Sequence, residues 1–292
     1  MTRLSMISSA AALALLTANS PAAAEQIEGE CPTFETAGEG PDLLLVPGLG
    51  SAPAVWDNVR DRLSETHRVH FIHVAGFAGR AANGDPGTII DRSIAEIIAY
   101  LDCEGIESTA YAGHSMGGFM GLKMAVEHRT RIDRLVVVDA LPFFPLIFSP
   151  DATVDTVQSQ ADSMRTQILA LDDDSFEQGQ RSGVRTFSQN ADYHPVIVEW
   201  SLTSDRATFA GAMHSIMTSD MRPLLAQIDT PTTVIAASNA FVPTARVEAL
   251  YNPAYANLSG VELQVVEDSF HFIMFDQPEA FGEALQAALT DE

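Results

Sequence analysis

One short segment, residues 113–118, constrains this chain more than any other. It reads Gly-His-Ser-Met-Gly-Gly, with an apolar run at 109–112 before it and a helix-forming run at 119–127 after it. A Gly-x-Ser-x-Gly pattern between a strand and a helix is typical of a nucleophile elbow, a tight turn that exposes the serine hydroxyl. Glycines suit such a turn because a Cβ there would collide with the neighbouring strand or helix. We therefore predict that Ser115 is a nucleophile; the alternative is a glycine-rich turn that fits the pattern by chance.

Apolar runs alternate with helical patterns along most of the chain. Several of the runs, such as 135–138, are apolar on both faces, which is typical of parallel strands covered by helices on both sides. Strands are expected at 33–38, 42–46, 69–74, 109–112, 135–138, 232–237 and 261–266. Between 142 and 228 only helical patterns occur, at 154–171, 175–188, 195–202 and 205–217. The sequence therefore predicts an α/β fold with a mostly parallel central sheet and a helical insertion over the sheet's C-terminal edge.

The first residues have the pattern of an export signal. Arg3 supplies a positive charge, residues 7–18 are apolar but too few to span a bilayer, and residues 22–24 offer an Ala-x-Ala cleavage site. We expect residues 1–24 to be removed near Ala24, leaving a soluble protein that is periplasmic or secreted. No later run is apolar and long enough to suggest stable anchoring in a membrane.

Composition excludes several classes of partner. The formal net charge is −23, from 16 basic and 39 acidic residues among 292. Such a charge repels nucleic acid and anionic membranes, so neither is an expected partner. The sequence has no phosphate-binding loop, dinucleotide fingerprint or cluster with metal-ligand spacing, so we expect no cofactor and no metal. The partner that we expect is a small molecule, and the sequence leaves the oligomeric state open.

The chain has two cysteines, Cys31 and Cys103. In an oxidising compartment they can pair, and closing so long a loop is worth about 4 kcal/mol on the chain-entropy model. The alternative is two unpaired thiols, and the spacing alone does not decide between them.

A serine hydroxyl needs an adjacent base to become a nucleophile. His271 is the best candidate because it follows the last predicted strand and precedes the final helix, so its loop can reach the edge of the sheet near Ser115. Two N–H donors are also needed to stabilise the oxyanion. We assign them to the backbone of Met116, directly after the nucleophile, and to Leu49 in the loop Pro47-Gly48-Leu49-Gly50. The alternative for that loop is an ordinary glycine turn.

These pieces together resemble the α/β-hydrolase fold superfamily, and in particular its esterase- and lipase-like members with a helical cap. The resemblance rests on residues 47–50 with Trp56 downstream, the elbow at 113–118, the run 135–139, and His271-Phe272 followed by 276–281. It implies a hydrolase core domain at 25–141 and 229–292, with a cap at 142–228. One departure is that the family usually has His-Gly in the oxyanion loop, where this chain has Pro47-Gly48.

The acid of the catalytic triad is the sharper departure. The family commonly places an Asp in the loop after the strand that follows the cap, and Asn239 occupies that place here. Some members place the acid after the preceding core strand, where this chain has Asp139. We predict that Asp139 orients His271, and the alternatives are Asp268, Glu267 or Asn239 itself.

The cap begins with an aromatic run. We expect Phe143, Phe144 and Phe148, together with Trp56, to contact the substrate, although packing inside the cap would explain the three phenylalanines as well. An apolar pocket beside a serine triad predicts hydrolysis of an uncharged, moderately hydrophobic carboxylic ester through an acyl-enzyme. Lactone, amide or carbon–carbon bond hydrolysis is the alternative within the family. A non-catalytic ligand-binding protein is the alternative from another class. The sequence does not determine the length of the acyl chain or the identity of the alcohol.

Overall fold

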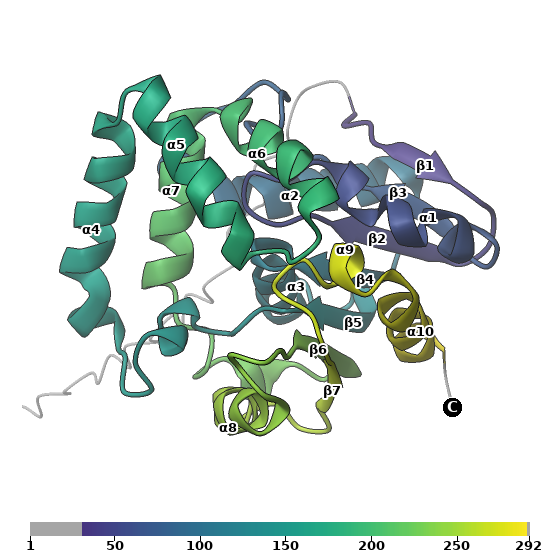
Figure 1. The fold of residues 1–292 in the computed structure, drawn as a ribbon. Coiled ribbons are helices and arrows are strands. Elements are labelled where there is room, and N and C mark those ends of the chain that lie inside the picture. The colour runs from purple at the N-terminus through teal and green to yellow at the C-terminus, as the bar shows by residue number, and fades with distance from the viewer. Residues whose placement is uncertain (1–30, 291–292) are drawn as a thin grey trace, which may run out of the picture. The chain divides into compact units, whose positions relative to one another are not determined.

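The computed structural model describes residues 31–290, and the expected export signal at 1–24 lies outside them. One seven-stranded sheet has the strand order β1-β3-β2-β4-β5-β6-β7. β1 runs antiparallel to β3, and the other neighbouring pairs are parallel (Figure 1). The strands are β1 (Glu35–Ala37), β2 (Asp42–Val46), β3 (Arg68–Phe71), β4 (Thr109–His114), β5 (Ile132–Val138), β6 (Thr232–Ala237) and β7 (Glu262–Val266). The predicted α/β fold is therefore confirmed.

Two hydrophobic cores lie on opposite faces of this sheet. Side chains alternate between the faces along a strand, so Leu44 and Val46 of β2 belong to one core while Leu43 and Leu45 belong to the other. The first core includes side chains of α2 (Ile89–Glu104), α3 (Met116–Glu127) and α8 (Thr244–Ala254). The second includes those of α1 (Asp57–Ser64), α9 (Ile273–Asp276) and α10 (Pro278–Leu289). Covering both faces explains why the side chains of central strands such as β4 and β6 are buried on both faces.

The segment between β5 and β6 is helical. It holds α4 (Val154–Ala170), α5 (Asp173–Gly183), α6 (His194–Leu202) and α7 (Arg206–Thr218), with α4 and α7 side by side in Figure 1. Polar side chains fix three of the helix starts: Thr153 caps α4, Asp172 caps α5 and Asp205 caps α7 by accepting backbone N–H bonds. No helix within residues 31–290 has the length and apolar character needed to cross a membrane.

Short 3₁₀ helices account for the main differences between predicted and observed elements. A 3₁₀ turn that begins at Pro53 precedes α1, and the helix expected at 175–188 gives way to another 3₁₀ turn after Gly183. The 3₁₀ helices are Pro53–Trp56, Pro86–Thr88, Phe144–Ile147, Val184–Thr186, Ala191–Tyr193 and Leu225–Gln227.

Cys31 and Cys103 form a disulfide that closes a loop with a sequence separation of 72. Cys103 lies on α2, so the bond ties the chain before β1 to a helix of the first core. Constraining a loop of this length in the unfolded chain stabilises the fold.

We expect replacement of both cysteines by alanine to lower the free energy of unfolding by about 2–4 kcal/mol, because the unfolded chain regains the loop entropy. Urea unfolding of the double variant and of the oxidised wild type measures this. Reducing the wild type with a thiol should give the same lower midpoint. An unchanged midpoint in both experiments would contradict the prediction.

Candidate active site

The elbow at Ser115 has the backbone that the sequence predicts. β4 ends at His114, α3 begins at Met116, and Ser115 between them has φ +55°. A Cβ on Gly113 would lie 2.3 Å from the Gly117 carbonyl oxygen, and one on Gly117 would lie 2.4 Å from that of Val46. Both distances are far inside van der Waals contact, so only glycine permits this turn. The strained serine conformation is the kind of outlier found at functional sites.

Asp139 and His271 are hydrogen-bonded to each other. Asp139 follows β5 with φ +45°, and its Oδ2 lies 2.7 Å from Nδ1 of His271. Its Oδ1 accepts hydrogen bonds from the Ala237 N–H and the Tyr251 hydroxyl, both at 3.1 Å. Burial alone would raise the pKa of Asp139, but the hydrogen bond and charge of His271, with help from the Ala237 N–H, hold that pKa below its usual value. Asp139 is therefore an ionised carboxylate behind the imidazole.

The other candidate acids make different contacts. The Asn239 side chain accepts from the N–H groups of Phe241 and Val242 and donates to the Ser269 carbonyl, so it braces its own loop. Glu267 accepts a hydrogen bond from the Thr244 hydroxyl. Within residues 31–290, no side-chain hydrogen bond joins Asn239, Glu267 or Asp268 to the His271 ring.

The loop that carries His271 is held by residues that sequence reasoning did not assign. Asp276 accepts the Phe270 N–H at 2.8 Å and the Ser188 hydroxyl at 2.6 Å, and so joins this loop to the helical segment. The N–H of Phe272 donates to the carbonyl of Phe187 at 2.8 Å. Asp276 lies within the family pattern at 276–281, which is the only signal that could have singled it out.

His114, inside the elbow, is a second residue that the sequence analysis passed over. Its Nε2 lies 2.9 Å from the His271 carbonyl oxygen, which can only accept, so Nε2 carries the proton and donates it. The side chain is buried, and Nδ1 has no partner among residues 31–290. Burial, with the charge of His271, lowers the pKa of His114 to about 3 despite that hydrogen bond. His114 therefore stays neutral and supports the backbone of His271.

Ser115 and His271 line one cavity of about 370 Å³, called the first cavity from here on. Leu49 of the predicted oxyanion loop lines it too, and a Cβ on neighbouring Gly48 would lie 3.1 Å from the Ser115 Cβ. The backbone N–H groups of Leu49 and Met116 make no hydrogen bond to any atom of residues 31–290. Both donors are therefore free to bind a ligand oxygen beside the serine.

Apolar side chains from α4, α5 and α7 enclose the rest of the first cavity. Met164, Phe176 and Met213 are among them, and none of the described lining residues is Asp, Glu, Lys or Arg. Phe144 also lines this cavity, as the sequence analysis expected. An uncharged, apolar group is the ligand that such walls favour.

Three of the aromatic residues expected to contact the substrate lie elsewhere. Trp56 is fully buried and stacks on Phe281 with ring centroids 6.2 Å apart, so it belongs to the second core. Phe143 is fully buried in the first core, under the Arg222 guanidinium. Both lie outside the described cavities beside His271, so their assignment to substrate binding is corrected. Phe148 is 59% exposed and lines a different cavity, described below.

No group of three or more His, Cys, Asp or Glu side chains in the described part of the chain is arranged to hold a metal ion. Ser115 and His271 instead line the first cavity together, and Asp139 is hydrogen-bonded to the His271 ring. This set can move a proton from the hydroxyl to the imidazole and stabilise the resulting positive charge.

A sequence model of the α/β hydrolase fold matches residues 41–278, and the chain therefore belongs to that family. Among similar proteins, a pimeloyl-[acyl-carrier protein] methyl ester esterase from Yersinia enterocolitica is 26% identical over 86% of this chain and 94% of its own. A protein of the same name from Aliivibrio salmonicida is 32% identical over 38% of this chain. The chain spans only about two fifths of the length of that relative and of others like it.

Solved structures with similar folds include an enol-lactonase from Burkholderia xenovorans, with a TM-score of 0.73 and 19% identity. That match covers 89% of this chain and 96% of the other. A hydrolase from Pseudomonas aeruginosa gives a TM-score of 0.75 and 20% identity over 88% and 94% of the two chains. At these identities the comparisons show the shared fold.

The depressed pKa of His114 makes stability depend on pH. Below its ordinary pKa of 6.5 the unfolded chain binds a proton at His114 that the folded chain does not bind until pH falls to about 3. Stability from this residue is therefore full above pH 6.5 and falls as pH decreases, by about 2 kcal/mol between pH 7 and 5.

We expect His114→Gln to remove this part of the pH dependence, because glutamine does not titrate. Chemical denaturation of both proteins at pH 7 and at pH 5 gives the two differences to compare. His128→Gln is the matched control, since that histidine is only partly buried and should leave most of the slope in place. Equal slopes for wild type and His114→Gln would show that His114 is protonated in the folded protein.

Proposed function

We propose that this protein is a serine hydrolase that cleaves carboxylic esters with an uncharged, apolar acyl group. The observation that carries the proposal is the convergence of Ser115, His271 and a free oxyanion donor on one apolar cavity, with an ionised Asp139 behind the imidazole. Membership of the α/β-hydrolase family supports the reaction class. The names of the esterase relatives agree with it.

The reaction proceeds in two halves. The Ser115 hydroxyl oxygen attacks the ester carbonyl carbon while Nε2 of His271 takes the hydroxyl proton, and the N–H groups of Leu49 and Met116 bind the oxyanion. His271 then gives that proton to the alcohol oxygen as the carbon–oxygen bond breaks. Water then attacks the acyl carbon while His271 takes its proton, and His271 passes that proton to the Ser115 oxygen as the bond to the acyl group breaks and the acid leaves. Asp139 holds the Nδ1–H tautomer and stabilises the imidazolium in both halves.

We also propose that the protein acts outside the cytosol. A disulfide between the chain's two cysteines persists in an oxidising compartment, and the N-terminal residues have the pattern of an export signal.

Lactones are intramolecular esters, so they belong in the substrate panel beside open-chain esters of short and medium acyl length.

A fluorophosphonate probe tests the nucleophile directly. We expect the wild type to be labelled and to hydrolyse 4-nitrophenyl butyrate, and Ser115→Ala to do neither while keeping its fold. Circular dichroism and thermal unfolding check the fold of both proteins. Folded wild type that is neither labelled nor active would favour the non-catalytic binding protein.

Substitutions at Asp139 and Asn239 identify the acid. We expect Asp139→Asn to lower kcat by on the order of 10³–10⁴-fold, because an amide leaves the His271 imidazolium without a counter-charge. Asn239→Ala removes only bonds within its loop, so its effect should stay below about tenfold. Steady-state kinetics on one ester at pH 8 compares the two variants. Near-native turnover in Asp139→Asn would remove Asp139 from the mechanism.

A further inference from the structure

A second cavity, of about 560 Å³, also reaches His271. Residues from α8 and from the segment after β5 line it, including Arg246, Tyr251 and Phe148. Ser115 and Leu49 are not among its described lining residues, although both line the first cavity. The two cavities therefore meet at the imidazole and lead to different parts of the molecule.

The charged groups of the second cavity are two arginines and one carboxylate. The carboxylate is Asp139, both of whose oxygens already accept hydrogen bonds. Arg222 is neutralised by Asp220, whose Oδ2 lies 2.6 Å from its Nη2. The Arg246 guanidinium makes no ion pair or hydrogen bond within residues 31–290. Arg246 is therefore the one charged side chain in the described lining of the second cavity that has no hydrogen-bond or ion-pair partner.

The position of His271 decides which half of an ester each cavity receives. The acyl carbonyl must lie against Ser115 and the N–H of Leu49, and these line the first cavity. The alcohol oxygen must lie beside the imidazole, because His271 returns the proton to it. Since His271 lines both cavities, an alcohol half that extends past the imidazole can reach the second cavity. Ile147 and Phe148, which are 47% and 59% exposed, offer apolar contacts along its wall.

We propose that the second cavity binds the alcohol half of the ester and that Arg246 binds a carboxylate on that half. The inference rests on the proposed function and changes one expectation from the sequence, that the whole ester is uncharged. The substrate class is an ester between an apolar acid and a hydroxy acid with an apolar body, such as a ring. A guanidinium and a carboxylate form paired, charge-assisted hydrogen bonds, which suits this recognition.

Two esters that differ in one group provide the test. 3-Carboxyphenyl butyrate has an anionic alcohol half, and 3-carbamoylphenyl butyrate is a neutral compound of nearly the same shape. We expect the wild type to favour the carboxylate by about fivefold in kcat/KM, mainly through KM, and less so at high salt, because the ion pair is partly exposed. Arg246→Gln should bring the ratio of the two esters close to one.

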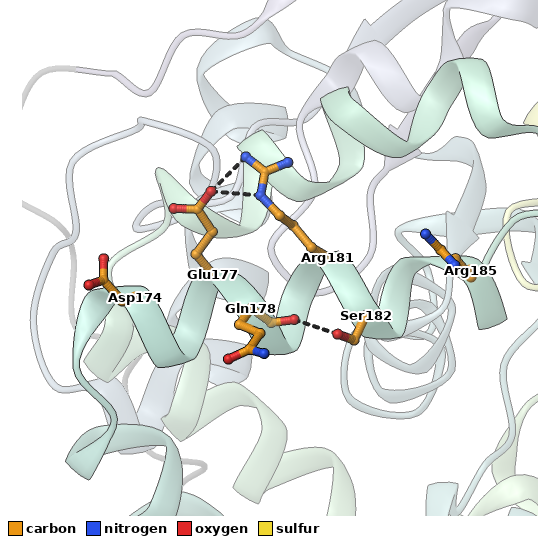
Figure 2. A pocket seen from close by; sticks show the side chains of 6 residues that line it. All are labelled: Asp174, Glu177, Gln178, Arg181, Ser182 and Arg185. Carbon is orange, nitrogen blue, oxygen red and sulfur yellow. Dashed lines mark hydrogen bonds and ion pairs between the residues drawn. The ribbon is translucent and has the colours of Figure 1, made fainter.

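Arg185→Gln is the matched control. Arg185 lies on the helical segment and lines a separate hollow with Glu177 and Arg181, where it makes no ion pair with the other residues drawn (Figure 2). This substitution removes the same charge outside the second cavity, so it should keep the wild-type ratio. If Arg185→Gln and Arg246→Gln lost the preference for the anionic ester equally, the preference would come from the net charge of the protein, and the proposal would be overturned.

A second pair of esters tests the direction. Monophenyl glutarate carries its carboxylate on the acyl half, and its terminal amide is the neutral counterpart. We expect no preference for the anion in this pair, because charged side chains are absent from the described lining of the first cavity. A preference for the anion in this pair, and not in the butyrate pair, would show that Arg246 contacts the acyl half and would contradict the proposal.

Product binding separates this inference from the proposed function. Ser115→Ala should bind 3-hydroxybenzoate more tightly than 3-hydroxybenzamide in an NMR titration, and Ser115→Ala/Arg246→Gln should not discriminate. If the protein prefers 3-hydroxybenzoate but the wild type hydrolyses no ester, the proposed activity is wrong and the anion site stands. Ester hydrolysis without discrimination would remove the anion site and keep the activity.

Discussion

The close approach of three backbone segments at the elbow is the constraint on which the rest of the site depends. Gly113 and Gly117 let β4 turn into α3 against the end of β2, with separations that leave no room for a Cβ. The turn places Ser115 at the C-terminal edge of the sheet and directs the free N–H groups at the start of α3 toward the same side. The oxyanion loop after β2 is brought beside the serine by the same contact. One steric requirement thus positions two components of the site together.

His271, the proposed base, is held at this edge by hydrogen bonds to residues at the ends of two neighbouring strands. Asp139, at the end of β5, holds the His271 ring, and His114, at the end of β4, holds the His271 carbonyl. Asp139 is charged and His114 is neutral, and there is a physical reason for this difference. The carboxylate stabilises the imidazolium, while a second positive charge only 4.5 Å away, at the centroid of the His114 ring, would oppose it. Burial keeps His114 neutral, so it supports the His271 backbone without placing a second positive charge beside that ring.

Local patterns in the sequence were enough to predict the strands, the elbow and the helical segment, because each depends on residues close together in the chain. The bond between Asp139 and His271 was the preferred prediction, but Asn239, Asp268 and Glu267 stayed open beside it, since the bond joins residues on different loops. The Tyr251 hydroxyl and the Asp276 carboxylate were missed for the same reason. Trp56 was misassigned because an aromatic residue after a glycine loop fits a core position and a pocket wall equally well. Its stacking on Phe281 is a contact that only the folded chain creates.

The position of the acid also affects the neighbouring cavity. Asn239 lines the second cavity, and its side-chain oxygen accepts two backbone N–H bonds within the loop after β6. An aspartate at 239 would bring a negative charge into that lining, where it would oppose a substrate carboxylate and attract Arg246. Asp139 lies behind the imidazole, and its charge is stabilised by hydrogen bonds from His271, Tyr251 and the Ala237 N–H. With the proposed acid at the end of β5, the loop after β6 carries no charged side chain, so Arg246 beside that loop is left without an ion pair within residues 31–290 and can bind the proposed carboxylate.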